Sequence, residues 1–89
     1  MKQSLKDELI NAIDFPKDAL LNLPKITLIG KNHLTVENHR GIVEYLPERV
    51  RINSTVGIIR VIGENMVINS IMTEVITITG EIKSVEIVV

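Results

Sequence analysis

Two periods of hydrophobic residues divide this 89-residue chain near Lys25. In residues 4–14 the apolar side chains recur every three to four positions, which predicts one amphipathic helix. From Lys25 onward apolar and polar residues alternate, which is the pattern of half-buried β-strands. We therefore predict an N-terminal helical lead over residues 1–24 and a single all-β unit over residues 25–89.

The predicted helix has one apolar stripe, formed by Leu5, Leu9 and Ile13. It should end at Phe15–Pro16, because the residue before a proline is pushed out of the helical region. Such a stripe could bind a partner or a membrane surface, or it could cover the chain's own sheet. We expect the last of these, because a chain of this size has little core of its own.

About eight short strands are predicted after the helix. Their apolar positions fall in residues 26–28, 34–36, 42–46, 50–52, 58–62, 66–68, 75–78 and 82–89. The connections are too short to contain a crossover helix, so neighbouring strands should pair antiparallel. We expect a meander, a small sandwich or a roll, with the β-branched run of residues 49–63 at its centre.

Similar glycines follow three of these strands. Gly30, Gly63 and Gly80 each come after a β-branched or leucine-rich run, and glycine there suits a tight turn with positive φ. Gly57 and Gly63, six positions apart within the strand pattern, each suit a turn or a bulge. The recurrence could be a weak internal repeat, which leaves a short β-solenoid as the alternative fold; recurring turn chemistry is the simpler explanation, since a solenoid needs about three clear repeats.

The composition indicates a soluble globular domain, with 45% hydrophobic and 24% charged residues. No apolar run approaches the roughly 20 residues that cross a bilayer. Cysteine is absent, which excludes disulfides and thiolate ligands and fits a reducing cytoplasm. Ten basic residues balance eleven acidic ones, and there are only one Tyr and one Phe, so we expect no nucleic-acid binding.

A polar cluster at residues 33–39 is the candidate for metal chemistry. On one strand His33, Thr35, Glu37 and His39 would share a face, which suggests two imidazoles and a carboxylate for a zinc-like ion. Six strand residues span roughly 20 Å, however, which is too far for one ion. We expect no metal site and no cofactor, and a metal-dependent hydrolase is the least favoured alternative.

Other catalytic groupings have no sequence signature. Glu37 with Glu44 could form an acid–base pair, and Ser54 or Ser70 could act as a nucleophile with a histidine. Neither serine lies in a nucleophile elbow, and the chain has no phosphate-binding glycine-rich loop. We therefore predict no catalytic residue and identify no small-molecule substrate.

Four segments, residues 16–30, 37–45, 49–53 and 57–63, resemble the YabP/YqfC family of sporulation proteins, and most closely its YqfC branch. The resemblance is specific because it includes ordered polar and glycine positions. Those positions are Glu37, Asn38, His39, Gly41, Glu44, Tyr45, Arg49, Arg51, Asn53, Gly57 and Gly63.

The resemblance implies a protein of endospore-forming bacteria, made in the mother cell and needed for spore development or coat assembly. The family offers no enzymatic activity to carry over. We therefore expect a non-enzymatic structural or interaction protein in the mother-cell cytoplasm or at the forespore surface, with other sporulation proteins as partners. The alternative is an adaptor that binds a membrane-associated partner through the helix or an open sheet edge.

The final strand, Val85–Val89, has one charge and no proline, so it would be poorly protected at a sheet edge. It could add a strand from a partner or a second copy, or it could simply complete the core. The candidate interaction residues are Leu5, Leu9, Ile13, Val85, Ile87 and Val89.

Overall fold

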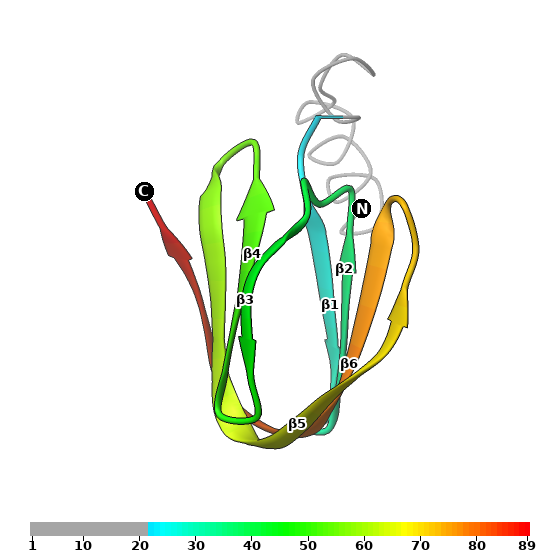
Figure 1. Ribbon diagram of the computed structural model, residues 1–89, viewed down its shortest axis with the longest axis vertical. Helices are drawn as coiled ribbons and strands as arrows, with labels where there is room; N and C mark the ends of the chain where they lie inside the picture. The colour runs from blue at the N-terminus through cyan, green and yellow to red at the C-terminus, as the bar shows by residue number, and fades with distance from the viewer. Residues whose placement is uncertain (1–21) are drawn as a thin grey trace, which may run out of the picture.

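A computed structural model describes residues 22–89, which form one open antiparallel sheet of six strands. The strands are β1 (Lys25–Ile29), β2 (His33–Glu37), β3 (Ile42–Leu46), β4 (Arg49–Ser54), β5 (Gly57–Ile71) and β6 (Val75–Val88). Their spatial order is β1-β2-β6-β5-β4-β3, so the β5–β6 hairpin is the centre of the sheet (Figure 1).

The long β5–β6 hairpin bends, and the sheet folds over on itself (Figure 1). β2 pairs with β6 only over residues 75–79, whereas β4 pairs with β5 only over residues 57–62. β5 and β6 therefore each belong to two half-sheets. The first half-sheet contains β1, β2, the start of β6 and the end of β5, and the second contains β3, β4, the start of β5 and the end of β6.

Two glycines permit this bend. A Cβ at Gly63 would overlap the carbonyl oxygen of Glu81, and a Cβ at Gly80 would lie 2.7 Å from Met66 Cα. The β5–β6 register shifts between Ile62 and Gly63, as expected where a ribbon bends sharply. The two strands can approach this closely only because neither residue has a side chain.

The core lies between the half-sheets and is made of alternating residues from four strands, β2, β4, β5 and β6. Its buried members are Leu34, Val36, Val50, Ile52, Ile59, Val61, Met66, Ile76, Ile78 and Ile82. The predicted burial of Val50 and Ile52, with Arg51 on the opposite face, is confirmed. Period-two alternation thus fixes the inner face of the sheet.

Residues 22–89 contain six strands and not the predicted eight. The predicted strands at 58–62 and 66–68 are both parts of β5, and those at 75–78 and 82–89 are both parts of β6. Gly30 does lie in a turn with a φ of 59°, but Gly63 and Gly80 lie inside β5 and β6 at the bend. A meander is also wrong, since β6 lies between β2 and β5. Every ladder is antiparallel, which rules out the alternative of a β-solenoid.

The predicted helix at residues 4–14, with Leu5, Leu9 and Ile13, lies outside the described residues, as does its predicted end at Phe15–Pro16. Within residues 22–89, no helix has the length and hydrophobicity needed to cross a bilayer.

Candidate functional site

The structure does not bring His33 and His39 together. His33 lies on the outer face of β2, whereas β2 ends at Glu37 and the chain turns at Asn38, whose φ is 62°. This turn ends the alternation of β2, so His39 does not share the outer face with His33, and its side chain is buried. No group of three or more His, Asp or Glu side chains within residues 22–89 could hold a metal ion. The residues suggested for a metal-dependent hydrolase thus do not form one site.

His39 fastens the connection between the half-sheets. Its Nδ1 accepts a hydrogen bond from the Gly41 amide at 2.9 Å, so the neutral ring carries its proton on Nε2 and donates to the Met72 carbonyl at 3.1 Å. Met72 lies in the turn between β5 and β6, and Gly41 lies just before β3. The imidazole therefore holds the connection between β2 and β3 against the central hairpin.

The other candidate catalytic residues are also separated. Ser54 donates a hydrogen bond to the Gly57 carbonyl at 2.6 Å within the β4–β5 turn, where Gly57 has a φ of 129°. Ser70 lies opposite Thr77 on the first half-sheet. Glu37 faces Lys25 on the first half-sheet, whereas Glu44 belongs to the second. Ser54 is thus used within a turn, and the two carboxylates considered as an acid–base pair lie on different half-sheets.

The second half of β6 is a strand with a free edge. Residues 84–88 pair with β5, and no second strand within residues 22–89 pairs with them. The last backbone hydrogen bond on the other side runs from the Ile82 amide to the Lys31 carbonyl at 2.7 Å. The edge position considered for the final strand therefore applies to this half of β6, whereas the first half of β6 lies between two strands.

Apolar side chains line this free edge. Val85 packs partly against the core, whereas Ile87 is 50% exposed on the inner face and Val88 is 41% exposed on the outer face. Val89 follows the end of the strand and is fully exposed. Val85 thus contributes to the core, as one of the two alternatives for this segment requires, whereas Ile87 remains accessible to solvent.

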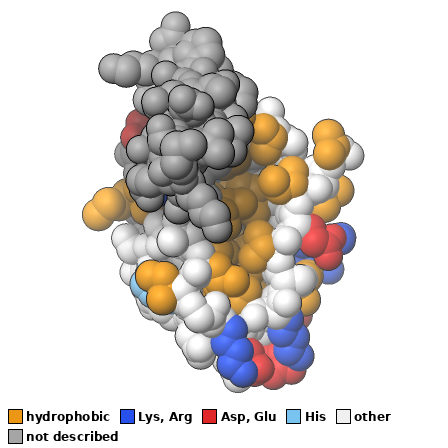
Figure 2. Space-filling model, turned by 180° about the vertical axis from the view of Figure 1, so that it is seen from behind, with side chains coloured by type: hydrophobic (Ala, Val, Ile, Leu, Met, Phe, Trp, Pro, Cys, Tyr) orange, Lys and Arg blue, Asp and Glu red, His pale blue; other side chains and the backbone are white. Residues whose placement is uncertain are grey.

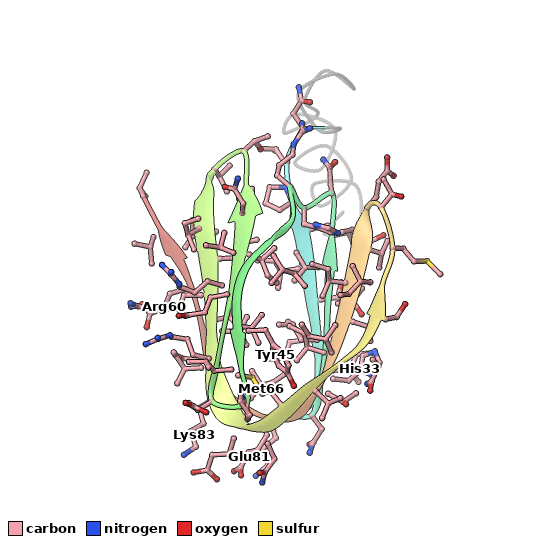
Figure 3. The ribbon with its side chains drawn as sticks, in the orientation of Figure 1. His33, Tyr45, Arg60, Met66, Glu81 and Lys83 are labelled. Atoms are coloured by element: carbon pink, nitrogen blue, oxygen red, sulfur yellow. The ribbon has the colours of Figure 1, made fainter. Side chains whose placement is uncertain are left out.

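A row of charged side chains crosses the outer face of the second half-sheet. The register places Glu44, Arg51, Arg60 and Glu86 opposite one another on four neighbouring strands. Arg60 Nη2 donates to Glu86 Oε2 at 2.6 Å, and Figure 3 shows Arg60 on the outside of the molecule, far from His33. The row ends at the free edge, since Glu86 lies on that strand.

Glu44 is the centre of a three-residue ion cluster. Arg49 donates to both carboxylate oxygens, at 2.7 Å and 3.2 Å, and Arg51 Nε donates to Oε1 at 3.1 Å. The hydrogen bond from Arg49 lowers the pKa of Glu44 below its ordinary value and raises that of Arg49. These contacts brace the β3–β4 hairpin on its outer face.

Most motif residues named from the resemblance have positions that support the fold. His39, Gly41 and the Glu44 cluster are described above. In addition, the Tyr45 hydroxyl donates to the Met66 carbonyl at 2.9 Å. The backbone N–H of Asn53 donates to the Gly41 carbonyl at 2.8 Å. Tyr45 and Met66 lie together near the bend (Figure 3). Sequence reasoning missed Arg60 and Glu86, which are 26 positions apart in the sequence and whose pairing depends on the register between β5 and β6.

The fold and these motif positions define a small β-sheet protein whose residues 22–88 match the YabP family, and the chain belongs to that family. Membership indicates a sporulation-related protein, in agreement with the resemblance. The chain is similar to the uncharacterized protein YqfC of Bacillus subtilis strain 168, with 36% identity over 87 residues that cover 98% of this chain and 94% of that protein. No solved structure gives a significant match.

Proposed function

We propose that this protein is a non-enzymatic structural or interaction protein of spore development that binds a partner strand along the free edge of β6. The observation that carries the proposal is the one-sided pairing of residues 84–88. A strand with unpaired backbone groups on one side is a template for strand addition.

The side chains of this edge do little to block such a partner. Natural edges are often protected by lysine or proline, and residues 84–88 contain neither. Their single charge, Glu86, is paired with Arg60 of the same chain. An added strand would therefore meet an edge that presents mainly Val85, Ile87 and Val88.

The same edge favours a different protein over a second copy. Two copies paired antiparallel around Glu86 would place like charges directly opposite each other, which is destabilising. A partner strand with apolar residues opposite Val85 and Ile87, and a polar or basic residue opposite Glu86, would fit better. Such a partner would be another sporulation protein, soluble in the mother cell or associated with the membrane at the forespore surface.

Site-specific photo-cross-linking in sporulating cells tests this function. A benzophenone amino acid replaces Val88 on the free edge of β6, and in a matched control it replaces Val43 of β3, which is 49% exposed on the other outer strand of the same half-sheet. We expect a discrete adduct with another protein from position 88 but not from position 43.

Equal adducts at both positions, or none at position 88, would contradict the proposal. An adduct with the mass of two copies of this chain would still support binding at the free edge of β6, but the partner would then be a second copy of this chain.

A further inference from the structure

The two half-sheets leave part of their inner faces uncovered beside β6. Leu28 of β1 pairs with buried Leu34 and therefore faces inward, yet it is 47% exposed. Ile87 pairs with buried Ile59 and is 50% exposed. Ile26 and Val85 are only partly buried. We name these four residues, Ile26, Leu28, Val85 and Ile87, the open inner strip.

The open inner strip lies on one side of the molecule. β6 is continuous through both half-sheets, and β1 lies on the side of β6 that faces away from β5, which is also the side of the free edge. Figure 2 shows hydrophobic side chains gathered in the gap between the two halves. An apolar surface at such a gap favours burial by another apolar segment.

Residues 22 and 23, the first that the structure describes, contact both half-sheets. The Asn22 carbonyl accepts a hydrogen bond from the Thr55 hydroxyl in the β4–β5 turn. The Leu23 carbonyl accepts one from Asn38 Nδ2 at 3.0 Å, just beyond the end of β2. The chain therefore enters the fold between the two half-sheets, at the end opposite the bend, with 21 residues preceding this point.

The preceding residues have the pattern and length needed to cover the strip. The Leu5, Leu9 and Ile13 stripe is apolar at helical spacing, and a helix over residues 4–14 would be about 16 Å long. Residues 15–21 can span up to about 25 Å when extended. The helix can therefore reach back from Asn22 along the gap.

We propose that residues 4–14 of the same chain dock as a helix on the open inner strip, with Leu5, Leu9 and Ile13 facing Leu28 and Ile87. This inference goes beyond the proposed function, because it concerns the inner faces of the half-sheets and not the backbone edge of β6. A second copy or a separate partner helix would be the competing occupants.

Paired cysteines in the 89-residue chain test the docking, since its sequence has no cysteine. Leu9→Cys is combined with Leu28→Cys in one variant and with Ile87→Cys in another, and a short bifunctional maleimide is added at low protein concentration. The two matched controls carry Asn11→Cys in place of the Leu9→Cys change. Residue 11 is two positions from residue 9 and lies on the opposite face of the predicted helix. Circular dichroism verifies that every variant retains its β-sheet.

We expect rapid cross-linking within one chain for at least one Leu9→Cys variant, and much slower cross-linking for both Asn11→Cys controls. Equal rates for positions 9 and 11, or no cross-link from position 9, would overturn the proposal. Cross-links only between two chains would also overturn it, in favour of a second copy. Because this measurement uses the purified protein alone, its result is independent of whether a partner binds the free edge.

Discussion

The motif residues show how single side chains hold distant segments of this sheet together. His39 uses both ring nitrogens to fix the β2–β3 connection, and Tyr45 reaches the backbone of Met66 at the bend. Glu44 gathers two arginines from the neighbouring strand. These contacts give a physical reason for polar residues at such positions that does not involve catalysis.

The Glu44 cluster should make the protein sensitive to acid. Because the folded pKa of Glu44 is lowered from 4.5, its ion pairs stabilise the fold fully above that pH and are lost as the pH falls through the lowered value. We therefore expect Glu44→Gln to lower the thermal midpoint at neutral pH, and this difference from the natural protein should shrink below about pH 4.5.

Thermal unfolding followed by circular dichroism between about pH 7 and pH 3 measures this convergence. Arg49→Gln, which removes the first partner of Glu44, should give a similar curve. Curves for Glu44→Gln and the natural protein that stay parallel through the acid range would contradict the assignment.

The strands themselves show what sequence could and could not predict. Alternation correctly placed Val50 and Ile52 inside, because one face of each strand is buried. The strand ends were misplaced at Gly63 and Gly80, since a glycine required by close strand contact looks in sequence like a glycine required by a turn. Only the neighbouring backbone, here Glu81 and Met66, distinguishes the two cases.

The candidate site, which is the free edge of β6 with the charged row beside it, was also predictable only in part. The composition of the last strand indicated that it would be unprotected if it lay at an edge, and the resemblance identified the Glu44 and Tyr45 positions. The charged row was not predictable, because pairing Arg60 with Glu86 requires the register between β5 and β6. That register depends on three shifts within the β5–β6 ladder, whose positions have no local signal beyond the glycines.

The β2–β3 connection provides a prediction for one element. His39→Ala removes the acceptor of the Gly41 amide and the donor to Met72, so it should destabilise the fold by about 1–3 kcal/mol. Hydrogen exchange at the Gly41 amide should accelerate, whereas the Arg40 amide, which donates to the Asn53 carbonyl at 2.7 Å, should be affected less. Equal acceleration at both amides would indicate that the whole connection, and not one contact, depends on His39.

At the scale of the whole molecule, the two half-sheets are not independent units. Each includes part of β5 and part of β6, and the core residues of both meet in one cluster. Loss of either half would remove pairing and burial from the other. The protein should therefore fold as one cooperative unit despite its open sheet.

Urea unfolding followed by two probes tests this cooperativity. Fluorescence of Tyr45, the single tyrosine in a chain without tryptophan, reports on the second half-sheet. The amide signal of Thr35 in β2 reports on the first half-sheet by nuclear magnetic resonance. We expect the same midpoint from both probes, whereas separated midpoints would show that the halves unfold independently.

The bend at Gly63 and Gly80 also determines how the molecule would respond to mechanical tension. The described chain begins at Asn22 and ends at Val89, both at the end of the molecule opposite the bend (Figure 1). A load applied between these two points would act across the gap between the half-sheets. The two halves of β5 and β6 would rotate apart about the bend at Gly63 and Gly80. Tension would therefore be resisted mainly by contacts between the two inner faces, and it would spread them apart before the hydrogen-bonded ladder of β5 and β6 was sheared.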